Sequence, residues 1–122
     1  MNLPDLSPVR LLIGLRGGIG AGALLAPGLA VRMLGLNPGE QMAFLARIIG
    51  VRDLAIALGT AAAGEENQRL WLSLGVLCDA TDGTAGLIAH RHGAISQLST
   101  ALVSAPAILG CGLGLAALRR HA

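Results

Sequence analysis

The sequence predicts an all-α fold, an integral membrane antiparallel four-helix bundle that forms one domain over residues 1–122. Hydrophobic residues make up 53% of the chain and charged residues only 13%, which is far from the average of soluble domains. Four stretches of about 20 mainly apolar residues are each long enough to cross a bilayer. Eighteen glycines and an aromatic content of 2% favour helices that pack by close backbone approach, as membrane helices do.

The four helices are expected at about residues 9–31, 41–63, 70–89 and 95–118. Ser7 is a suitable N-cap for the first helix, with Pro8 in its first turn. Pro27 ends the regular part of that helix, so residues 29–36 are expected as a short amphipathic piece at the membrane interface.

The loops between the helices are short and rich in charged or turn-forming residues. They are expected at residues 32–40, 64–69 and 90–94. Loops of this length make consecutive helices antiparallel neighbours, and Pro106 is expected to kink the last helix.

The distribution of arginine indicates how the bundle is oriented, because an even number of crossings puts both termini on one side. The side of the termini holds Arg10, Arg69, Arg119 and Arg120, whereas the opposite side holds Arg32 and Arg91. The positive-inside rule therefore predicts a multi-pass protein of the cell membrane with cytoplasmic termini.

Charge and cysteine usage argue against several functional classes. The net charge of +2 is small and scattered, so no nucleic-acid partner is expected. Cys78 and Cys111 lie in apolar runs without a CxxC spacing, which predicts packing residues and not a disulfide framework or a zinc site. The Asp-x-x-Asp pair, Asp79 and Asp82, could hold Mg²⁺ for a diphosphate, but we do not favour a metal because there is one pair and no lysine.

Charged residues inside the predicted spans are the feature that needs an explanation. They are Arg16, Arg47, Arg52, Asp53, Asp79 and Asp82, and their charges sum to zero. A lone charge at the bilayer centre costs about 2.5–3.5 kcal/mol on insertion scales. We therefore expect these residues to pair with one another across different helices.

Helical geometry places the acidic residues of the third predicted helix on one face. At about 100° per residue, Asp79 and Asp82 fall on the same side as three glycines. These are Gly75, Gly83 and Gly86. Because glycine leaves the face thin, a neighbouring helix or a ligand can approach the two carboxylates closely.

The first and second helices give a less uniform picture. Arg16 shares a stripe with Gly20, whereas Gly14, Gly18 and Gly22 form a G-x-x-x-G-x-x-x-G run on the opposite side. This glycine seam is expected to pack within the bundle, with a second copy of the chain as the alternative partner. On the second helix Arg47 is expected to reach the headgroups, whereas Arg52 and Asp53 lie near the midplane about 100° apart.

The decapeptide from Gly50 to Gly59, GVRDLAIALG, resembles a signature of small bacterial membrane proteins, G-x-R-D-L-x-x-x-L-G. Those families have four predicted spans and are filed as uncharacterised. The resemblance implies the four-helix layout and implies that Arg52 and Asp53 are family features. It implies no activity.

One functional hypothesis is an intramembrane enzyme that uses acid and base chemistry on a hydrophobic small molecule such as an isoprenoid or polyketide. Its reactions would be epoxide opening, cyclisation or isomerisation, none of which needs a cofactor. The expected catalytic residues are Asp53, Asp79, Asp82 and Arg52. The expected substrate-binding residues are Arg16, Gly75, Gly83, Gly86, Thr100 and Ser104. One of Asp79 and Asp82 is expected to hold a proton, because close carboxylates repel when both are ionised.

Two other hypotheses remain open from the sequence. The charges can be interhelical contacts that fix packing in a structural or accessory subunit, or parts of a small oligomeric transporter or proton conductor in which His90 extends the acidic stripe. An enzyme needs a pocket that touches the three carboxylates, a scaffold needs those groups fully paired, and a conductor needs a wet path to both surfaces.

Overall fold

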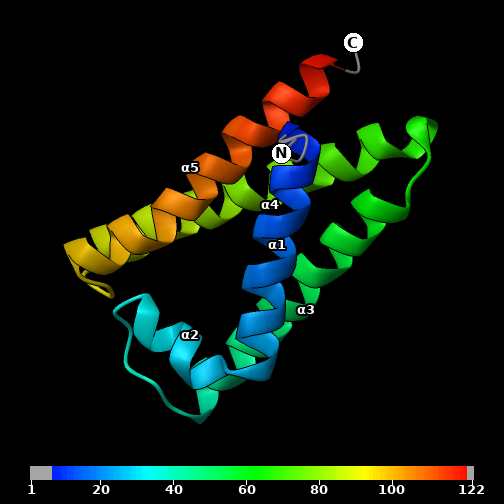
Figure 1. Ribbon diagram of the computed structural model, residues 1–122. Coiled ribbons are helices and arrows are strands. Elements are labelled where there is room, and N and C mark those ends of the chain that lie inside the picture. The colour runs from blue at the N-terminus through cyan, green and yellow to red at the C-terminus, as the bar shows by residue number, and fades with distance from the viewer. Residues whose placement is uncertain (1–6, 121–122) are drawn as a thin grey trace, which may run out of the picture.

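The computed structural model describes residues 7–120, and within that range it contains five α-helices and no strand (Figure 1). The helices are α1 (Pro8–Leu25), α2 (Pro27–Met33), α3 (Glu40–Ala62), α4 (Glu65–Arg91) and α5 (Gln97–Arg120). The predicted all-α class is confirmed, and each long helix contains most of the stretch expected for it. The start of α4 is five residues earlier than expected, because Glu65 and Glu66 in its first turn stabilise the positive end of the helix dipole.

The first predicted helix is divided in two at Ala26. The backbone nitrogen of Arg10 donates a 3.3 Å hydrogen bond to the Ser7 hydroxyl, so the expected N-cap is present. Pro27 is the first residue of α2, where its missing N–H costs nothing. The short helix expected at residues 29–36 therefore begins two residues earlier and ends at Met33.

The four long helices form two antiparallel pairs, α1 with α3 and α4 with α5, which cross each other (Figure 1). The first pair is held by a contact between two glycines. A methyl group at Gly20 would lie 2.7 Å from the carbonyl oxygen of Gly50, and a methyl group at Gly50 would lie 2.7 Å from that of Gly20. Neither position can therefore take a larger residue without moving a helix backbone.

The two pairs are also linked near both of their ends. Where α3 turns into α4, the ring of Trp71 covers Gly59, with ring carbons 2.6 Å from the place of a methyl group. At the opposite end the Ser99 hydroxyl donates a 3.0 Å hydrogen bond to the Gly35 carbonyl, which joins the segment after α2 to the start of α5. The charged residues described below lie between these two contacts, in the middle of the molecule.

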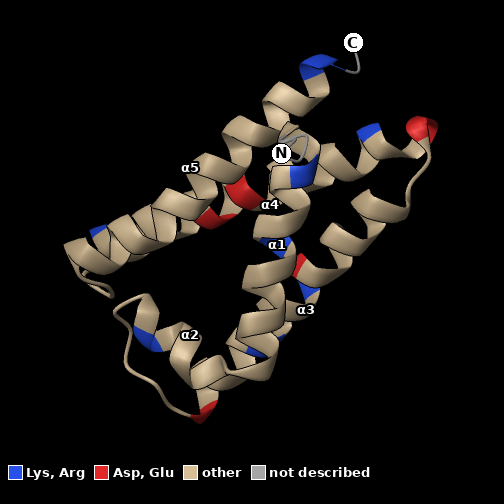
Figure 2. Ribbon diagram, viewed as in Figure 1, with Lys and Arg blue, Asp and Glu red and all other residues tan. Residues whose placement is uncertain are grey.

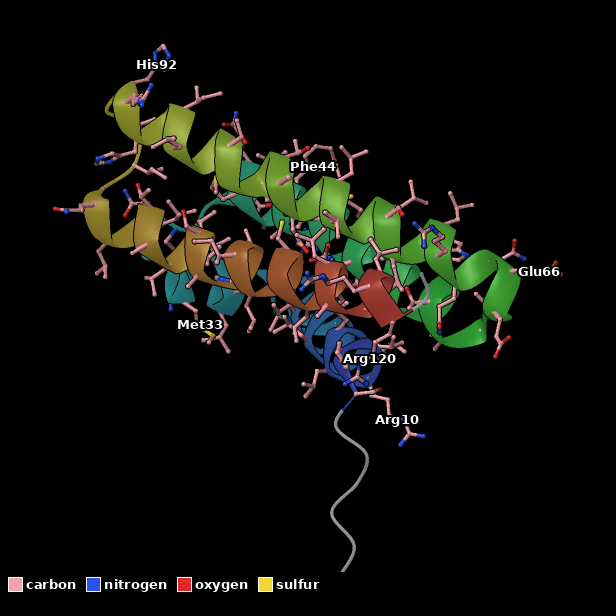
Figure 3. All side chains as sticks on the ribbon, turned by 90° about the horizontal axis from the view of Figure 1, so that it is seen from above. Arg10, Met33, Phe44, Glu66, His92 and Arg120 are labelled. Carbon is pink, nitrogen blue, oxygen red and sulfur yellow. The ribbon has the colours of Figure 1, made fainter. Side chains whose placement is uncertain are left out.

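Several polar side chains are buried, and many large apolar ones are exposed. Half of the buried hydrophobic residues are alanine, whereas Leu25, Leu77 and Ile108 are 82%, 62% and 71% exposed. The side-chain view shows Met33 projecting from the ribbon, with Glu66 and His92 at opposite ends of α4 (Figure 3). Exposed apolar residues of this size are numerous for a domain in water, where such side chains are mostly buried.

Within residues 7–120, α1 and α5 are long and apolar enough to cross a membrane. The other two long helices carry the interior charges, such as Arg52 in α3 and Asp79 in α4, which lower their mean hydropathy. The expectation that all four long helices span a bilayer stays a prediction.

Candidate functional site

Five charged residues form ion pairs where the two helix pairs cross. They are Arg16 of α1, Arg52 and Asp53 of α3, and Asp79 and Asp82 of α4. Figure 2 shows red and blue ribbon segments of α1, α3 and α4 in this part of the molecule. At 1.5 Å per residue, Arg16 lies about 12 Å along α1 and Asp53 about 14 Å from the end of α3. We call these five residues the charged layer.

Arg16 and Asp79 form the more deeply buried ion pair of this layer. The Nη1 atom of Arg16 donates to Oδ1 of Asp79 at 3.2 Å, and its Nη2 atom donates to Oδ2. Their side chains are only 7% and 10% exposed. The two residues therefore form a bidentate ion pair between α1 and α4, and bulk solvent is excluded from it.

Two glycines make room for this ion pair. A methyl group at Gly75 of α4 would lie 2.7 Å from Nη2 of Arg16, and one at Gly110 of α5 would collide with the carboxylate of Asp79. The guanidinium and the carboxylate each lie against bare backbone, which sets how closely α1 and α5 approach α4. Gly110 was not among the residues singled out from the sequence. It lies on the same small-residue stripe of α5 as Ala107 and Gly114, and this stripe is the pattern that could have identified it as a contact position.

Arg52 is shared between two carboxylates. It donates to Oδ1 and Oδ2 of Asp82 at 3.0 and 2.7 Å, through Nη1 and Nη2. It also donates to Oδ1 of Asp53 at 3.2 and 2.9 Å, through Nε and Nη2. Because the Arg52 and Asp82 side chains are 32% and 34% exposed, this group lies at the edge of the charged layer. We call Arg52, Asp53 and Asp82 the Arg52 cluster.

The pairing of the charges across helices is as predicted. Asp79 and Asp82 pair with different arginines, one from α1 and one from α3. The expectation that one of these two aspartates holds a proton stays a prediction. Arg47 is exposed and, within residues 7–120, has no ion-pair partner. Arg47, which was expected to reach the headgroups, therefore lies outside the charged layer, and this layer holds the other five charges of the predicted spans.

Four of the six residues expected to bind substrate lie in contacts between helices. Arg16 belongs to the buried ion pair and Gly75 lies against it, as described above. Gly83 and Gly86 face Ala107 and Val103 of α5, whose atoms lie 3.7 and 3.3 Å from the places of added methyl groups. The hydroxyl of Thr100 donates to the Ser96 carbonyl at 2.8 Å, and Ser104 is half-buried on α5.

Two surface depressions of the described chain are lined by other residues than those of the charged layer. One is formed on α4 by residues between Ala80 and Ile88, and another lies between α4 and α5 near Arg69 and Arg119. No residue of the charged layer lines either of them. Within residues 7–120, every buried side-chain nitrogen and oxygen has a hydrogen-bond partner, and no three acidic, histidine or cysteine side chains are placed to hold a metal.

The glycine seam of α1 lies on the outer surface. Gly14, Gly18 and Gly22 are exposed, and a methyl group at any of them would meet no described atom within 4 Å. The prediction that this seam packs within the bundle is therefore wrong. The opposite side of α1, which carries Arg16 and Gly20, makes those contacts instead.

Comparison of the chain with protein-family models, with curated proteins and with solved structures finds no match. The resemblance of residues 50–59 to the signature of small membrane proteins therefore stays a prediction.

Proposed function

We propose that the protein is a multi-pass membrane protein in which all four long helices cross the bilayer and both termini are cytoplasmic. The support is the arrangement of polar and apolar groups. The charged layer is internal, near the middle of the long helices, while large apolar side chains on every helix face outward. In water this arrangement would expose a large apolar surface. In lipid the apolar side chains contact hydrocarbon, and the charged residues contact one another inside the bundle.

We further propose that the protein is a structural or accessory membrane subunit, and that the charged layer joins its two helix pairs. One observation carries this conclusion. Arg16 of α1 and Arg52 of α3 each bind an aspartate of α4 through both carboxylate oxygens. Both α1 and α3 are therefore joined to α4 by a bidentate ion pair. Such pairs fix the register of neighbouring helices.

The surface through which such a subunit would associate is the glycine seam of α1. Gly14, Gly18 and Gly22 leave the backbone bare over three successive turns, with no described atom covering them. A second helix can approach such a surface closely. We propose a second copy of the chain as its partner.

Chemical crosslinking in lipid nanodiscs or native membranes tests this association. We expect the wild type to form crosslinked dimers and Gly18→Leu to lose them, because the leucine side chain separates the two backbones. Gly112→Leu is the matched control, since Gly112 is exposed on α5 and also has no described atom within 4 Å of an added methyl group. A wild type that stays monomeric, or equal loss of dimer in both variants, would contradict the proposal.

An intramembrane acid–base enzyme is the second candidate function, and the exposure of the Arg52 cluster favours it. About a third of the Arg52 and Asp82 side chains remains uncovered, so a hydrophobic molecule could reach these groups from the side. A carboxyl group and an ionised carboxylate beside a guanidinium are suitable for epoxide opening, cyclisation or isomerisation. Mass spectrometry of organic extracts from the purified wild type and Asp53→Asn tests this reading. A stoichiometric non-lipid compound that differs between the two supports it, whereas phospholipid alone in both contradicts it.

A further inference from the structure

The charged layer contains one more negative charge than positive charges. Three carboxylates face two guanidinium groups in it. Arg16 and Asp79 neutralise each other through two hydrogen bonds and are nearly excluded from solvent. The excess negative charge therefore belongs to the Arg52 cluster, in which one guanidinium serves both Asp53 and Asp82.

No other cation of the described chain compensates this charge. Of the helices that pack against α3, α1 contributes Arg16, which is engaged by Asp79, and α4 contributes only the carboxylates of Asp79 and Asp82 at this level. Arg32 of α2 is exposed. Within residues 7–120, Arg52 is the only basic side chain within 4.0 Å of Asp53 or Asp82. An unbalanced charge at this depth in a bilayer carries a cost of several kcal/mol, which binding of a proton removes.

The hydrogen bonds distinguish Asp53 from Asp82 as the place for that proton. Both oxygens of Asp82 accept hydrogen bonds from Arg52, whereas Asp53 accepts through Oδ1 alone. Its Oδ2 atom has no partner among the described residues, although Asp53 is only 8% exposed. Because every fully buried side-chain oxygen of the described chain has a partner, this Oδ2 atom keeps contact with the surroundings of the protein.

We propose that the Arg52 cluster binds one proton, carried on Oδ2 of Asp53, so that Asp53 is a neutral carboxylic acid inside the bilayer. The inference rests on the proposed membrane placement, because only a medium of low polarity penalises the excess charge enough. Protonation leaves the two hydrogen bonds to Oδ1 in place and makes the whole cluster neutral. The free O–H group can then donate a hydrogen bond to an oxygen atom of a hydrophobic ligand.

Infrared spectroscopy of the full chain in lipid nanodiscs at neutral pH tests the proposal, because a protonated carboxyl group has its own carbonyl stretch. We expect one such band in the wild type and none in Asp53→Asn. We also expect the band to disappear in Asp82→Asn, because Arg52 and Asp53 then balance each other and Asp53 ionises. Glu66→Gln, in the exposed first turn of α4, is the control and should keep the band.

A second pair of variants locates the proton. Asp53→Glu should shift the frequency of the band, whereas Asp82→Glu should leave it in place. Absence of the band in the wild type overturns the proposal, as does a band that survives in Asp53→Asn or shifts only in Asp82→Glu. Circular dichroism confirms that each variant retains its helices before its spectrum is compared.

The failure of this proposal and the failure of the membrane placement give different results. If the band is absent while outward-facing residues at this depth remain inaccessible to a water-soluble maleimide, the proton is refuted and the membrane placement stands. If those residues react freely with the maleimide, the membrane placement itself is refuted.

Discussion

Replacing Asp79 by alanine should destabilise the protein far more than replacing Asp82, although the two residues are one turn apart on α4. Asp79→Ala removes both acceptors of the Arg16 guanidinium, whose side chain is 7% exposed. Arg16 is too deeply enclosed to turn to solvent, and within residues 7–120 no other carboxylate forms an ion pair with it. Arg52 keeps an acceptor after Asp82→Ala, because it still donates to Asp53.

The expected magnitudes follow from this difference. An uncompensated buried charge costs about 3–5 kcal/mol in the free energy of unfolding, and an arginine at the centre of a membrane helix costs about 2.5–3.5 kcal/mol on insertion scales. We therefore expect Asp79→Ala to lower stability by about 3 kcal/mol. After Asp82→Ala, Arg52 still pairs with Asp53 and no cation is left without a partner, so we expect a loss of about 1 kcal/mol, the size of one polar contact between membrane helices.

Reversible unfolding in mixed micelles, with increasing denaturing detergent, measures both values. The double variant Arg16→Met with Asp79→Ala should recover most of the lost stability, because an ion pair replaced by apolar groups leaves no buried charge. Thr81→Ala is the control on the exposed side of α4. Equal losses for Asp79→Ala and Asp82→Ala, or a double variant less stable than Asp79→Ala, would refute the reasoning.

Two further predictions concern glycines that face neighbouring helices. Gly50→Ala should lower the free energy of unfolding by about 1–3 kcal/mol, because its methyl group would meet the Gly20 carbonyl 2.7 Å away. Gly112→Ala, which is exposed and outside the glycine seam, should leave stability unchanged or raise it by up to about 1 kcal/mol, and the same unfolding assay compares the two variants. Gly59→Ala should displace the ring of Trp71, which lies 2.6 Å from the new methyl group. Because Trp71 is the single tryptophan, a changed emission maximum reports the displacement, and an unchanged spectrum would contradict the contact.

Helix positions were predictable because they follow from local chemistry. The Ser7 cap and the break at Pro27 depend on residues adjacent in sequence, and both are present. The early start of α4 was missed because residues 65–69 are too polar to count as apolar span, although the two glutamates favour a helix start there.

The pairing of the charges was predictable only in part. Helical geometry placed Asp79 and Asp82 on one face, but three residues rotate by about 60° around a helix. That angle is enough to direct one carboxylate to Arg16 and the other to Arg52. Which neighbour each one meets depends on the crossing of the two helix pairs, which no local pattern contains.

The glycine seam illustrates a different limit. Both sides of α1 carry small residues, so a small-residue pattern alone does not tell which side faces the bundle. The position of Arg16 was the better indicator, because a charged residue inside a span must face the interior to find a partner. Its stripe is the buried one, and the seam is therefore outside.

The accessibility of Leu77 to water tests the central claim most directly, since this residue is 62% exposed and lies about 18 Å from the start of α4. The measurement uses Leu77→Cys in a chain with Cys78→Ala and Cys111→Ala, reacted in lipid nanodiscs with a water-soluble maleimide. Asn67→Cys, exposed in the first turn of α4, is the matched control. The account predicts that Asn67→Cys reacts at once and that Leu77→Cys reacts only after denaturing detergent is added. Equal rates at the two positions would show that water covers the apolar surface and would contradict the membrane account.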